Sequence, residues 1–344
     1  MSSRSAFVTG CTGFVGLNLI GELTRQGWRV TAFHRPDSHT RRLDRYRVEH
    51  ALGDVVDPQS LLAALPQAVD AVFHVAGSSN LWARRNPEQT RVNVDGTRNV
   101  VQAALARAAR RLVFCSSWVA YGAQPQRFNE EAPQLGGRSW VNHFKSKYLA
   151  EQEIRAGIAQ GLFACIINPS LILGPGDTQG WARIIQLVQA RRLPGVPPGR
   201  VNFCDVREVA KALIAAAERG RNGQNYLLGG PDTSFMELVQ AIGEVTGRTV
   251  PAKPTRAWAL WMMGRLQSWA SRFTGKAPTL TPEIAYSVSR RMSCDFSLAE
   301  RELGYRATDV RSMLQASYQW LRDEGLLKTD DLNTQAGQDA QFNR

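Results

Sequence analysis

The chain has 344 residues, of which 43% are hydrophobic and 21% are charged. A chain of this length buries enough core to fold without disulfides or metal. Its apolar runs are too short to span a bilayer, so we expect a soluble globular protein without a transmembrane segment. The first residues, MSSRSAFVTG, enter a strand pattern at once and leave no room for a signal peptide, which predicts a cytoplasmic location.

The charge balance is basic, with 42 Lys and Arg against 30 Asp and Glu. Such a balance is also typical of nucleic-acid-binding proteins. The basic residues are dispersed, however, in short pairs such as Arg84-Arg85 and Arg290-Arg291, without interleaved aromatic residues. We therefore interpret the charge as a solvated surface and expect no nucleic-acid partner. The five cysteines form no CxxC pair, so we also expect neither disulfides nor a metal site.

Short apolar runs alternate with helical patterns from residue 5 to about residue 170. The expected strands are residues 6–10, 28–35, 48–54, 70–77, 111–117 and 163–170. Near-continuous apolar strands separated by helices predict a parallel sheet that is covered on both faces. The predicted fold class is therefore α/β, a Rossmann-type doubly wound parallel sheet formed by residues 1–170 with contributions from 201–230. Asp57-Pro58 and Asn86-Pro87 each predict a helix start, with an N-cap side chain before proline.

After residue 170 the pattern changes to shorter elements between glycine and proline clusters, such as LGPGD at 173–177. We predict a smaller substrate-binding region over residues 171–328. Ser234 and Glu237 predict a capping box for a helix over 235–246. The polar residues 329–344 are expected to be a disordered tail.

One further helix is expected over residues 255–273, where large apolar residues recur at helical spacing. They are Trp258, Met262, Leu266, Trp269 and Phe273, and they fall within an arc of roughly 80°. Arg265 and Arg272 flank this stripe. We interpret the stripe first as core; the alternatives are a lid over an apolar substrate and a peripheral contact with a membrane surface.

A glycine-rich turn, GCTGFVG at residues 10–16, connects the first strand to the first helix. That order lets the backbone approach a pyrophosphate at the start of a helix, where free amides favour negative charge. The second strand ends in Arg35, followed by Arg41 and Arg42, where an NAD-preferring site would offer a carboxylate. Because arginine suits a 2′-phosphate, we predict NADP(H); Asp37 keeps NAD as the second choice.

These motifs together resemble the extended short-chain dehydrogenase/reductases, also called the NAD-dependent epimerase/dehydratase family. The resemblance covers about residues 5–325 and includes TGCTGFVG, GD at 53–54, FHVAG at 73–77, NVDGT at 93–97 and FCSSWVAYG at 114–122. Later segments, INPSLILGPGD at 167–177, FCDVREVAKA at 203–212 and CDFSLAERELGY at 294–305, are more similar to the dihydroflavonol reductase and 3β-hydroxysteroid dehydrogenase branch. Tyr121 in the VAYG run points instead to the sugar-nucleotide enzymes.

The resemblance implies a set of residues around the cofactor. They are Gly10, Thr12, Gly13, Phe14, Val15, Gly16, Arg35, Asp54, Val55, Val75, Ala76, Gly77, Lys147, Asn168, Pro169 and Ser170. The expected substrate is a small, bulky apolar or aromatic molecule, and its expected contacts are Ser78, Trp82, Trp118 and Tyr121. The family also implies a homodimer built on segments that include 87–109 and 141–160.

The family's catalytic group is a serine with a tyrosine and a lysine spaced YxxxK. In VNHFKSKYLAEQ, residues 141–152, Lys147 falls on the lysine and His143 falls on the tyrosine, while Ser117 matches the serine. Residues four apart share a helix face, so Lys147 can act on its partner, whereas Tyr148 lies about 100° away. Imidazole can exchange protons near neutral pH, but a neighbouring ammonium would depress its pKa.

Three functions remain open from these residues. The first is an NADP(H)-dependent ketone or aldehyde reductase, or alcohol dehydrogenase, with His143 as proton carrier or positioning group. The second is an epimerase, dehydratase or isomerase that uses bound NAD(P) without net turnover. The third is a catalytically degenerate NADPH-binding sensor or partner subunit.

Overall fold

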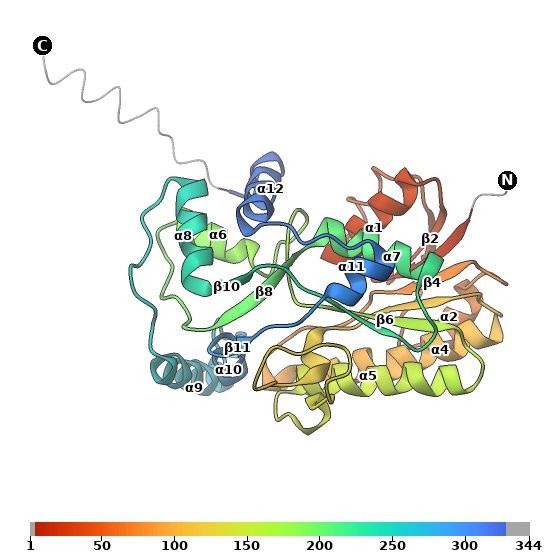
Figure 1. Ribbon diagram of the computed structural model, residues 1–344, viewed down its shortest axis with the longest axis horizontal. Coiled ribbons are helices and arrows are strands. Elements are labelled where there is room, and N and C mark those ends of the chain that lie inside the picture. The colour runs from red at the N-terminus through yellow and green to blue at the C-terminus, as the bar shows by residue number, and fades with distance from the viewer. Residues whose placement is uncertain (1–3, 328–344) are drawn as a thin grey trace, which may run out of the picture.

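The structure, a computed structural model, describes residues 4–327, so the tail expected at 329–344 lies outside the described residues (Figure 1). Its larger part is a seven-stranded parallel sheet with the order β3-β2-β1-β4-β5-β6-β9. The strands are β1 (Ser5–Thr9), β2 (Arg29–His34), β3 (Glu49–Leu52), β4 (Ala71–His74), β5 (Leu112–Cys115), β6 (Ala164–Pro169) and β9 (Asn225–Leu228). Six of them lie in the expected segments, which confirms the predicted Rossmann-type sheet.

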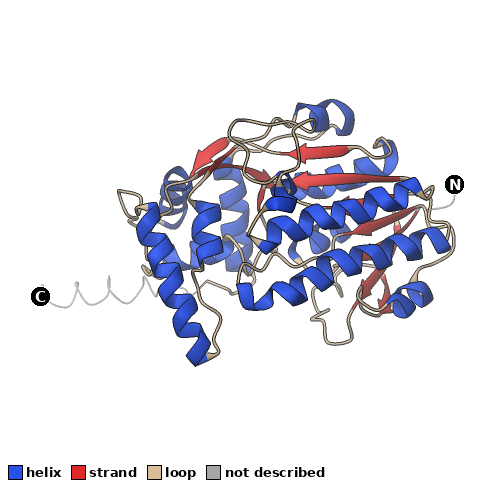
Figure 2. Ribbon diagram, turned by 90° about the horizontal axis from the view of Figure 1, so that it is seen from below, coloured by secondary structure: helices blue, strands red, loops and turns tan. Residues whose placement is uncertain are grey.

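Helices cover both faces of this sheet, as Figure 1 shows. One face carries α1 (Phe14–Arg25), α7 (Val206–Arg219) and α11 (Ser297–Leu303); the other carries α2 (Pro58–Ala64), α4 (Gly96–Ala106) and α5 (Asn142–Ala159). A separate apolar core fills the space on each face. Figure 2 shows the second face from below, where long helices lie side by side. The strand order reverses between β1 and β4, which is where doubly wound folds open a crevice for ligands.

A smaller sheet lies beside the large one and has its own apolar core. Its strands are β7 (Leu171–Leu173), β8 (Arg200–Asp205), β10 (Asp232–Ser234) and β11 (Arg291–Met292). β7 and β11 run parallel to β8, and β10 runs antiparallel to it. The packed helices are α6 (Ala182–Gln189), α8 (Phe235–Thr246) and α12 (Val310–Asp323). We expected segment 201–230 to contribute to the large sheet. It is divided between the two sheets, because β9 belongs to the large sheet and β8 to the small one.

The observed starts of the helices can be compared with the N-caps that the sequence predicts. Asp57 accepts a hydrogen bond from the Gln59 amide at 3.0 Å, and both halves of the Ser234 and Glu237 capping box are present, so these two predictions are confirmed. The prediction that the Asn86 side chain caps the start of a helix is wrong. A 3₁₀ turn, Ala83–Arg85, precedes α3 (Asn86–Thr90), so Asn86 already has helical backbone angles and its side chain does not cap. A π-helical turn, Arg91–Asp95, joins α3 to α4.

The tryptophan-rich helix is α9 (Ala257–Thr274), which packs against α10 (Pro282–Val288). The core interpretation of its apolar stripe is wrong: Trp258, Trp269 and Phe273 are 65%, 60% and 75% exposed. Small residues take the packed side instead, and a Cβ on Gly264 would lie 2.7 Å from the Thr281 carbonyl carbon. Among residues 4–327, no helix combines the length and the apolar character needed to cross a membrane.

A buried carboxylate on α5 connects this helix to the large sheet through hydrogen bonds. Glu151 is fully buried and accepts hydrogen bonds from four side chains that lie between 2.5 and 2.9 Å away. The donors are Ser116, Gln134, Asn168 and Asn225. They come from the end of β5, the loop before α5, β6 and β9, so one charge fixes the position of α5 relative to three strands.

Removing this acceptor should destabilise the fold strongly. Glu151→Ala leaves four donors without their partner, three of them buried, and we expect a loss of about 3–5 kcal/mol in the free energy of unfolding. The control is Glu153→Ala on the same helix, which removes a half-exposed ion pair with Arg98 and should cost about 0.5 kcal/mol or less. Urea unfolding of both variants gives the difference; equal losses would contradict the role given to Glu151.

Candidate active site

The glycine turn after β1 is closely packed against β4. Gly10 has a φ of +71°, and a Cβ there would lie 2.5 Å from the Ala76 nitrogen. A Cβ on Gly16 would lie 2.1 Å from the Gly10 carbonyl oxygen. The chain can make this turn only with glycine at these two positions. α1 then begins without a side-chain cap and without an acidic residue in its first turn, so its free amides suit an anion such as a pyrophosphate.

The other expected cofactor residues gather at the same edge of the sheet. Thr12, Gly13, Phe14 and Val15 lie in the turn and the start of α1, directly after β1. Asp54 and Val55 follow β3, and Val75, Ala76 and Gly77 follow β4. A Cβ on Gly77 would lie 3.4 Å from the Lys147 Nζ, so the loop after β4 reaches the expected catalytic helix. These residues therefore gather at the carboxyl ends of the strands around β1 and β4, where doubly wound folds bind their ligands.

The end of β2 presents arginines in two different situations. Arg35 is exposed and forms an ion pair of 3.4 Å with Asp37. Arg42 and Arg45 turn away toward α12, where both pair with Glu324 at 3.6 and 3.1 Å. Arg35 is therefore the arginine of this segment that stays at the strand end.

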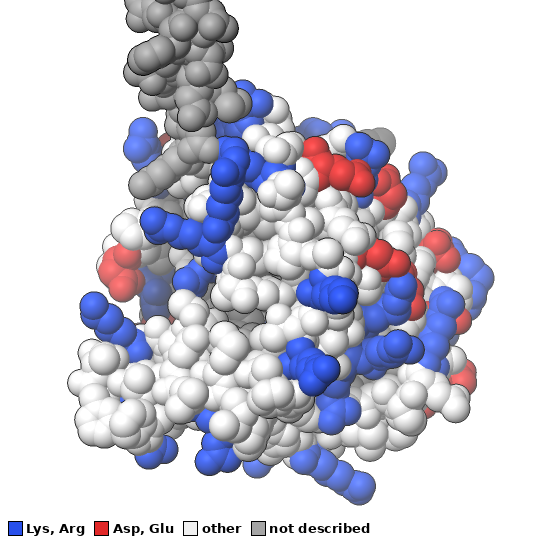
Figure 3. Space-filling model, turned by 90° about the vertical axis from the view of Figure 1, so that its left-hand side faces the viewer, with Lys and Arg blue, Asp and Glu red and all other residues white. Residues whose placement is uncertain are grey.

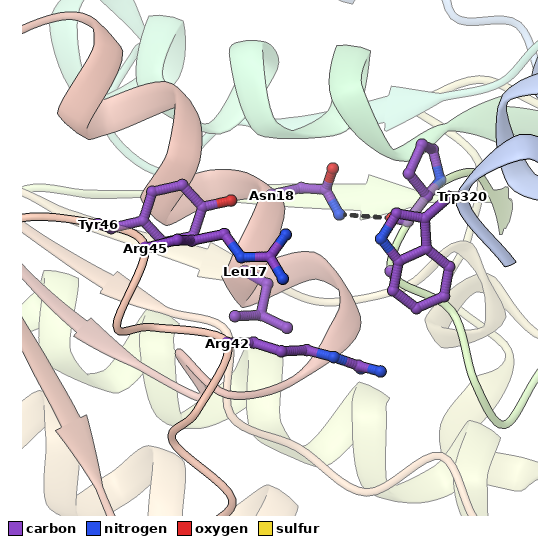
Figure 4. Close-up of a pocket in the computed structure, with 8 residues that line it drawn as sticks. Leu17, Asn18, Arg42, Arg45, Tyr46 and Trp320 are labelled. Atoms are coloured by element: carbon purple, nitrogen blue, oxygen red, sulfur yellow. Dashed lines mark hydrogen bonds between the residues drawn. The ribbon is translucent and has the colours of Figure 1, made fainter. Parts of the chain in front are cut away.

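A small pocket separates α1 from α12, and Figure 4 shows its lining. Asn18 donates a hydrogen bond to the Pro175 carbonyl at 2.8 Å on one side, and Arg42 lies over the Trp320 ring at 5.0 Å on the other. Its volume is about 140 Å³, while pockets for drug-sized ligands measure about 300–1,000 Å³. This pocket is too small for a dinucleotide. The candidate cofactor site rests instead on the glycine turn and the uncapped start of α1.

Lys147 and His143 lie on one face of α5, next to the end of β5, as the four-residue spacing predicts. Lys147 is 8% exposed and donates a hydrogen bond to the Cys115 carbonyl at 3.0 Å. Burial lowers the pKa of this ammonium, while Cys115 and Glu151 act in the opposite direction. Ser117 follows β5 directly, and its Oγ accepts a hydrogen bond from the Val119 amide at 3.4 Å. The structure thus brings the three expected catalytic residues to one place.

The His143 imidazole is neutral at physiological pH. Burial first, and the Lys147 ammonium second, lower its pKa to about 3. The effect of Lys147 was expected, and the larger effect of burial was not. The backbone of Ser78 acts in the opposite direction and favours the protonated ring. Nδ1 is closed to water and has no hydrogen-bond partner among the described residues, so this nitrogen is not used within the protein.

Asn168 supports the site from behind instead of facing the crevice. It is fully buried, and its amide donates to the Ser117 carbonyl at 3.1 Å and to Glu151 at 2.6 Å. Its Oδ1 accepts from Asn225 at 2.8 Å. The donors and the acceptor of the Asn168 side chain are therefore used within the protein, and its place in the cofactor site stays a prediction. Pro169 and Ser170 are also buried beside Ser117.

Two of the expected substrate contacts belong to the core. Trp118 and Tyr121 are 3% and 1% exposed, and both pack against Phe128. The short helical turn Trp118–Tyr121 directs them into the apolar core of the smaller region, so the expectation that they line an open pocket is wrong. Ser78 and Trp82 remain partly exposed on the loop after β4.

A group of aromatic residues that includes Phe144, next to His143, was not expected from the sequence. The Phe144 ring lies 6.5 Å from the His143 ring and 6.4 Å from Tyr286 on α10. Trp140 is 54% exposed and lies edge-on to Tyr286 at 5.3 Å. We call Trp140, Phe144 and Tyr286 the aromatic wall. Trp140 and Phe144 flank His143 in the sequence and could have been found, whereas nothing in the sequence connects Tyr286 to them.

Comparison with known proteins agrees with this geometry. Residues 6–229 match the model of the NAD dependent epimerase/dehydratase family. The chain is 30% identical over 331 residues to a putative dihydroflavonol 4-reductase of Synechocystis, covering 94% of this chain and 96% of that protein. It is 27% identical to a 3 beta-hydroxysteroid dehydrogenase/Delta 5-->4-isomerase of Mycobacterium tuberculosis, covering 87% and 85%.

Among solved structures, that of gox2253 superposes with a TM-score of 0.82 and 30% identity, covering 95% of this chain and all of that one (100%). The relatives named here are reductases and dehydrogenases. NAD(P) is the cofactor typical of the matched family, and the glycine turn, the uncapped start of α1 and the buried lysine fit it. The chain belongs to the NAD-dependent epimerase/dehydratase family, the extended short-chain dehydrogenase/reductases.

Proposed function

We propose that the chain is an NADP(H)-dependent oxidoreductase that interconverts a hydroxyl and a carbonyl group on a bulky apolar or aromatic substrate. The observation that carries the proposal is the shared buried face of α5, where Lys147 and His143 meet the end of β5 and the loop after β4. Ser117 completes the group. We place the chain on the dihydroflavonol reductase and 3β-hydroxysteroid dehydrogenase branch, supported by the names of its relatives.

Each residue has a distinct task in this proposal. A nicotinamide held at the carboxyl ends of β1 and β4 would supply or accept the hydride. Lys147 is held in the crevice by the Cys115 carbonyl and directs its remaining N–H groups toward the nicotinamide ribose. Ser117 donates its hydroxyl proton in a hydrogen bond to the substrate oxygen, because its Oγ otherwise has only weak contacts at 3.4 and 3.5 Å.

His143 exchanges the proton in place of the family's tyrosine. Its Nδ1 lone pair can take the hydroxyl proton of an alcohol as the hydride leaves the same carbon, and it returns that proton in the reverse direction. Because Nδ1 is closed to water, a substrate hydroxyl reaches it only after the imidazole rotates or the loop at Ser78 moves. At neutral pH the unprotonated imidazole can accept a proton but, because its pKa is lowered, holds that proton weakly; oxidation therefore needs no prior deprotonation of the ring, whereas reduction needs the rare protonated form.

The aromatic wall supports the proposed substrate class. Trp140 lies edge-on to Tyr286, and Tyr286 lies 6.4 Å from Phe144, the residue that follows His143. Such surfaces suit a fused-ring or aryl substrate, which agrees with the steroid and flavonoid names of the two relatives.

As a further part of this proposal, the chain forms a homodimer through the face that carries α4 and α5 (Figure 2).

Removing the imidazole should abolish most of the activity. We expect His143→Ala to lower kcat by about 10²–10⁴-fold, the range of a general acid or base. Tyr148→Phe is the matched control, because the Tyr148 ring packs against Gly137 and should leave kcat unchanged. The measurement is turnover of steroid and aryl alcohols followed through NADPH absorbance. Unchanged kcat in His143→Ala would contradict the proton role, and enzyme that retains oxidised cofactor without net turnover would point to an epimerase or isomerase.

The pH dependence should lack the usual histidine transition. Because the folded pKa is lowered to about 3, His143 is already deprotonated above about pH 5, so kcat for alcohol oxidation should be flat between about pH 5 and 8. Carbonyl reduction needs the protonated ring, so its kcat should rise about tenfold for each pH unit lowered over the same interval. Steady-state kinetics in both directions provide the test. An oxidation profile with a midpoint near pH 6.5 would be incompatible with a buried, neutral imidazole.

Cofactor choice should depend on Arg35. Arg35→Ser removes the exposed guanidinium at the end of β2 and should raise KM for NADPH at least about tenfold more than KM for NADH, the value of a lost charge-assisted hydrogen bond. Arg29→Ser is the control, since Arg29 lies at the opposite end of the same strand. The test is to measure KM for NADPH and for NADH in both variants. Equal changes for the two cofactors in Arg35→Ser would count against a preference for NADP(H).

A further inference from the structure

The outer side of α9 carries a continuous apolar surface that no described residue covers. Its members are 41% to 75% exposed, and we call them the α9 face: Trp258, Trp261, Met262, Leu266, Trp269 and Phe273. The Trp269 and Phe273 rings are in contact at 5.0 Å, so the surface is not a set of isolated residues. Single exposed apolar residues are ordinary, but a contiguous group of this kind marks an interaction site.

Packing holds the α9 face outward. Leu260, Gly264 and Ser271 are the buried residues of α9, and at about 100° per residue they lie roughly opposite the centre of the α9 face. Gly264 lies so close to Thr281 that a side chain there would collide with the backbone. α9 therefore cannot turn its apolar side inward without losing its contact with α10.

The surroundings of the α9 face are basic. Between residues 249 and 282 the sequence has five Lys and Arg and no Asp or Glu: Lys253, Arg256, Arg265, Arg272 and Lys276. None of the five forms an ion pair with a carboxylate within residues 4–327. The Arg265 guanidinium lies over the Trp261 ring at 4.7 Å, on the edge of the α9 face. Figure 3 shows this side of the molecule, whose lower part is uncharged with Lys and Arg around it.

We infer that the chain docks onto the surface of an anionic lipid membrane through the α9 face. Tryptophan, phenylalanine and leucine enter the boundary between headgroups and acyl chains, while the arginines reach the lipid phosphates. A second copy of the chain is a poor occupant, because pairing two α9 faces would bring their basic residues together without any acidic partner. The inference concerns binding alone and does not depend on the reaction at His143.

The position of α9 connects this contact to the candidate active site. α10 packs along α9 and carries Tyr286 of the aromatic wall. Thr281, just before α10, donates a hydrogen bond to the Leu81 carbonyl at 2.6 Å, which links the pair of helices to the loop after β4. A protein docked through the α9 face would therefore hold the aromatic wall near the lipid surface.

Vesicle flotation of the full chain tests the inference. The probes are vesicles of phosphatidylcholine alone and vesicles in which about one third is phosphatidylglycerol. The apolar variant is Trp258→Ser/Trp269→Ser/Phe273→Ser, with Leu52→Ser on β3 as the control for an exposed apolar residue elsewhere. The charge variant is Arg265→Gln/Arg272→Gln, with Arg41→Gln/Arg47→Gln as its control on the loop after β2. Circular dichroism verifies that each variant is folded.

We expect binding to the anionic vesicles that weakens with added salt and is lower without phosphatidylglycerol. The apolar and charge variants should each bind at least about tenfold more weakly than their controls. The inference is overturned if the native chain does not float with anionic vesicles, or if the apolar variant binds as well as Leu52→Ser. It is equally overturned if the native chain ignores vesicles while the apolar variant converts a dimer to a monomer in light scattering, since a second copy would then be the occupant.

Discussion

The buried ammonium of Lys147 is the interaction on which the rest of the candidate site depends. Its charge lies in the protein interior with one hydrogen bond to the Cys115 carbonyl and with the Phe114 ring 5.2 Å away. A buried charge is costly unless neighbouring groups stabilise it, so its surroundings have to be fixed. The fully buried Glu151, one helical turn further along α5, supplies the opposite charge and holds the helix on the sheet.

The same charge determines the state of the histidines beside it. Burial first, and Lys147 second, lower the pKa values of His74 and His143, each to about 3. His74 is held on both sides by hydroxyl groups, with Nδ1 2.8 Å from Thr9 Oγ1 and Nε2 3.0 Å from Thr97 Oγ1. The Nδ1 of His143 has no partner within the described residues. The two rings therefore differ: His74 is a satisfied core residue, while the Nδ1 of His143 is available for the proposed proton exchange.

The sequence predicted those features that depend on neighbours along the chain. The strands, the glycine turn after β1 and the capping box of α8 follow from local pattern and backbone chemistry, and the spacing of His143 and Lys147 fixes them on one face of α5. The errors concern contacts between distant segments. Trp118 and Tyr121 are buried by Phe128. The stripe on α9 has the spacing of a core helix, and its orientation depends on which side fits Thr281.

The central claim is that His143 is a neutral ring beside a buried ammonium. The most direct measurement is a pH titration of ¹⁵N-labelled histidine in the full chain by NMR, with the His143 signals identified by their loss in His143→Ala. The account predicts that His143 keeps its proton on Nε2 and stays neutral from pH 8 to about pH 5. A His143 signal that titrates near pH 6.5, as a solvated imidazole does, would contradict it.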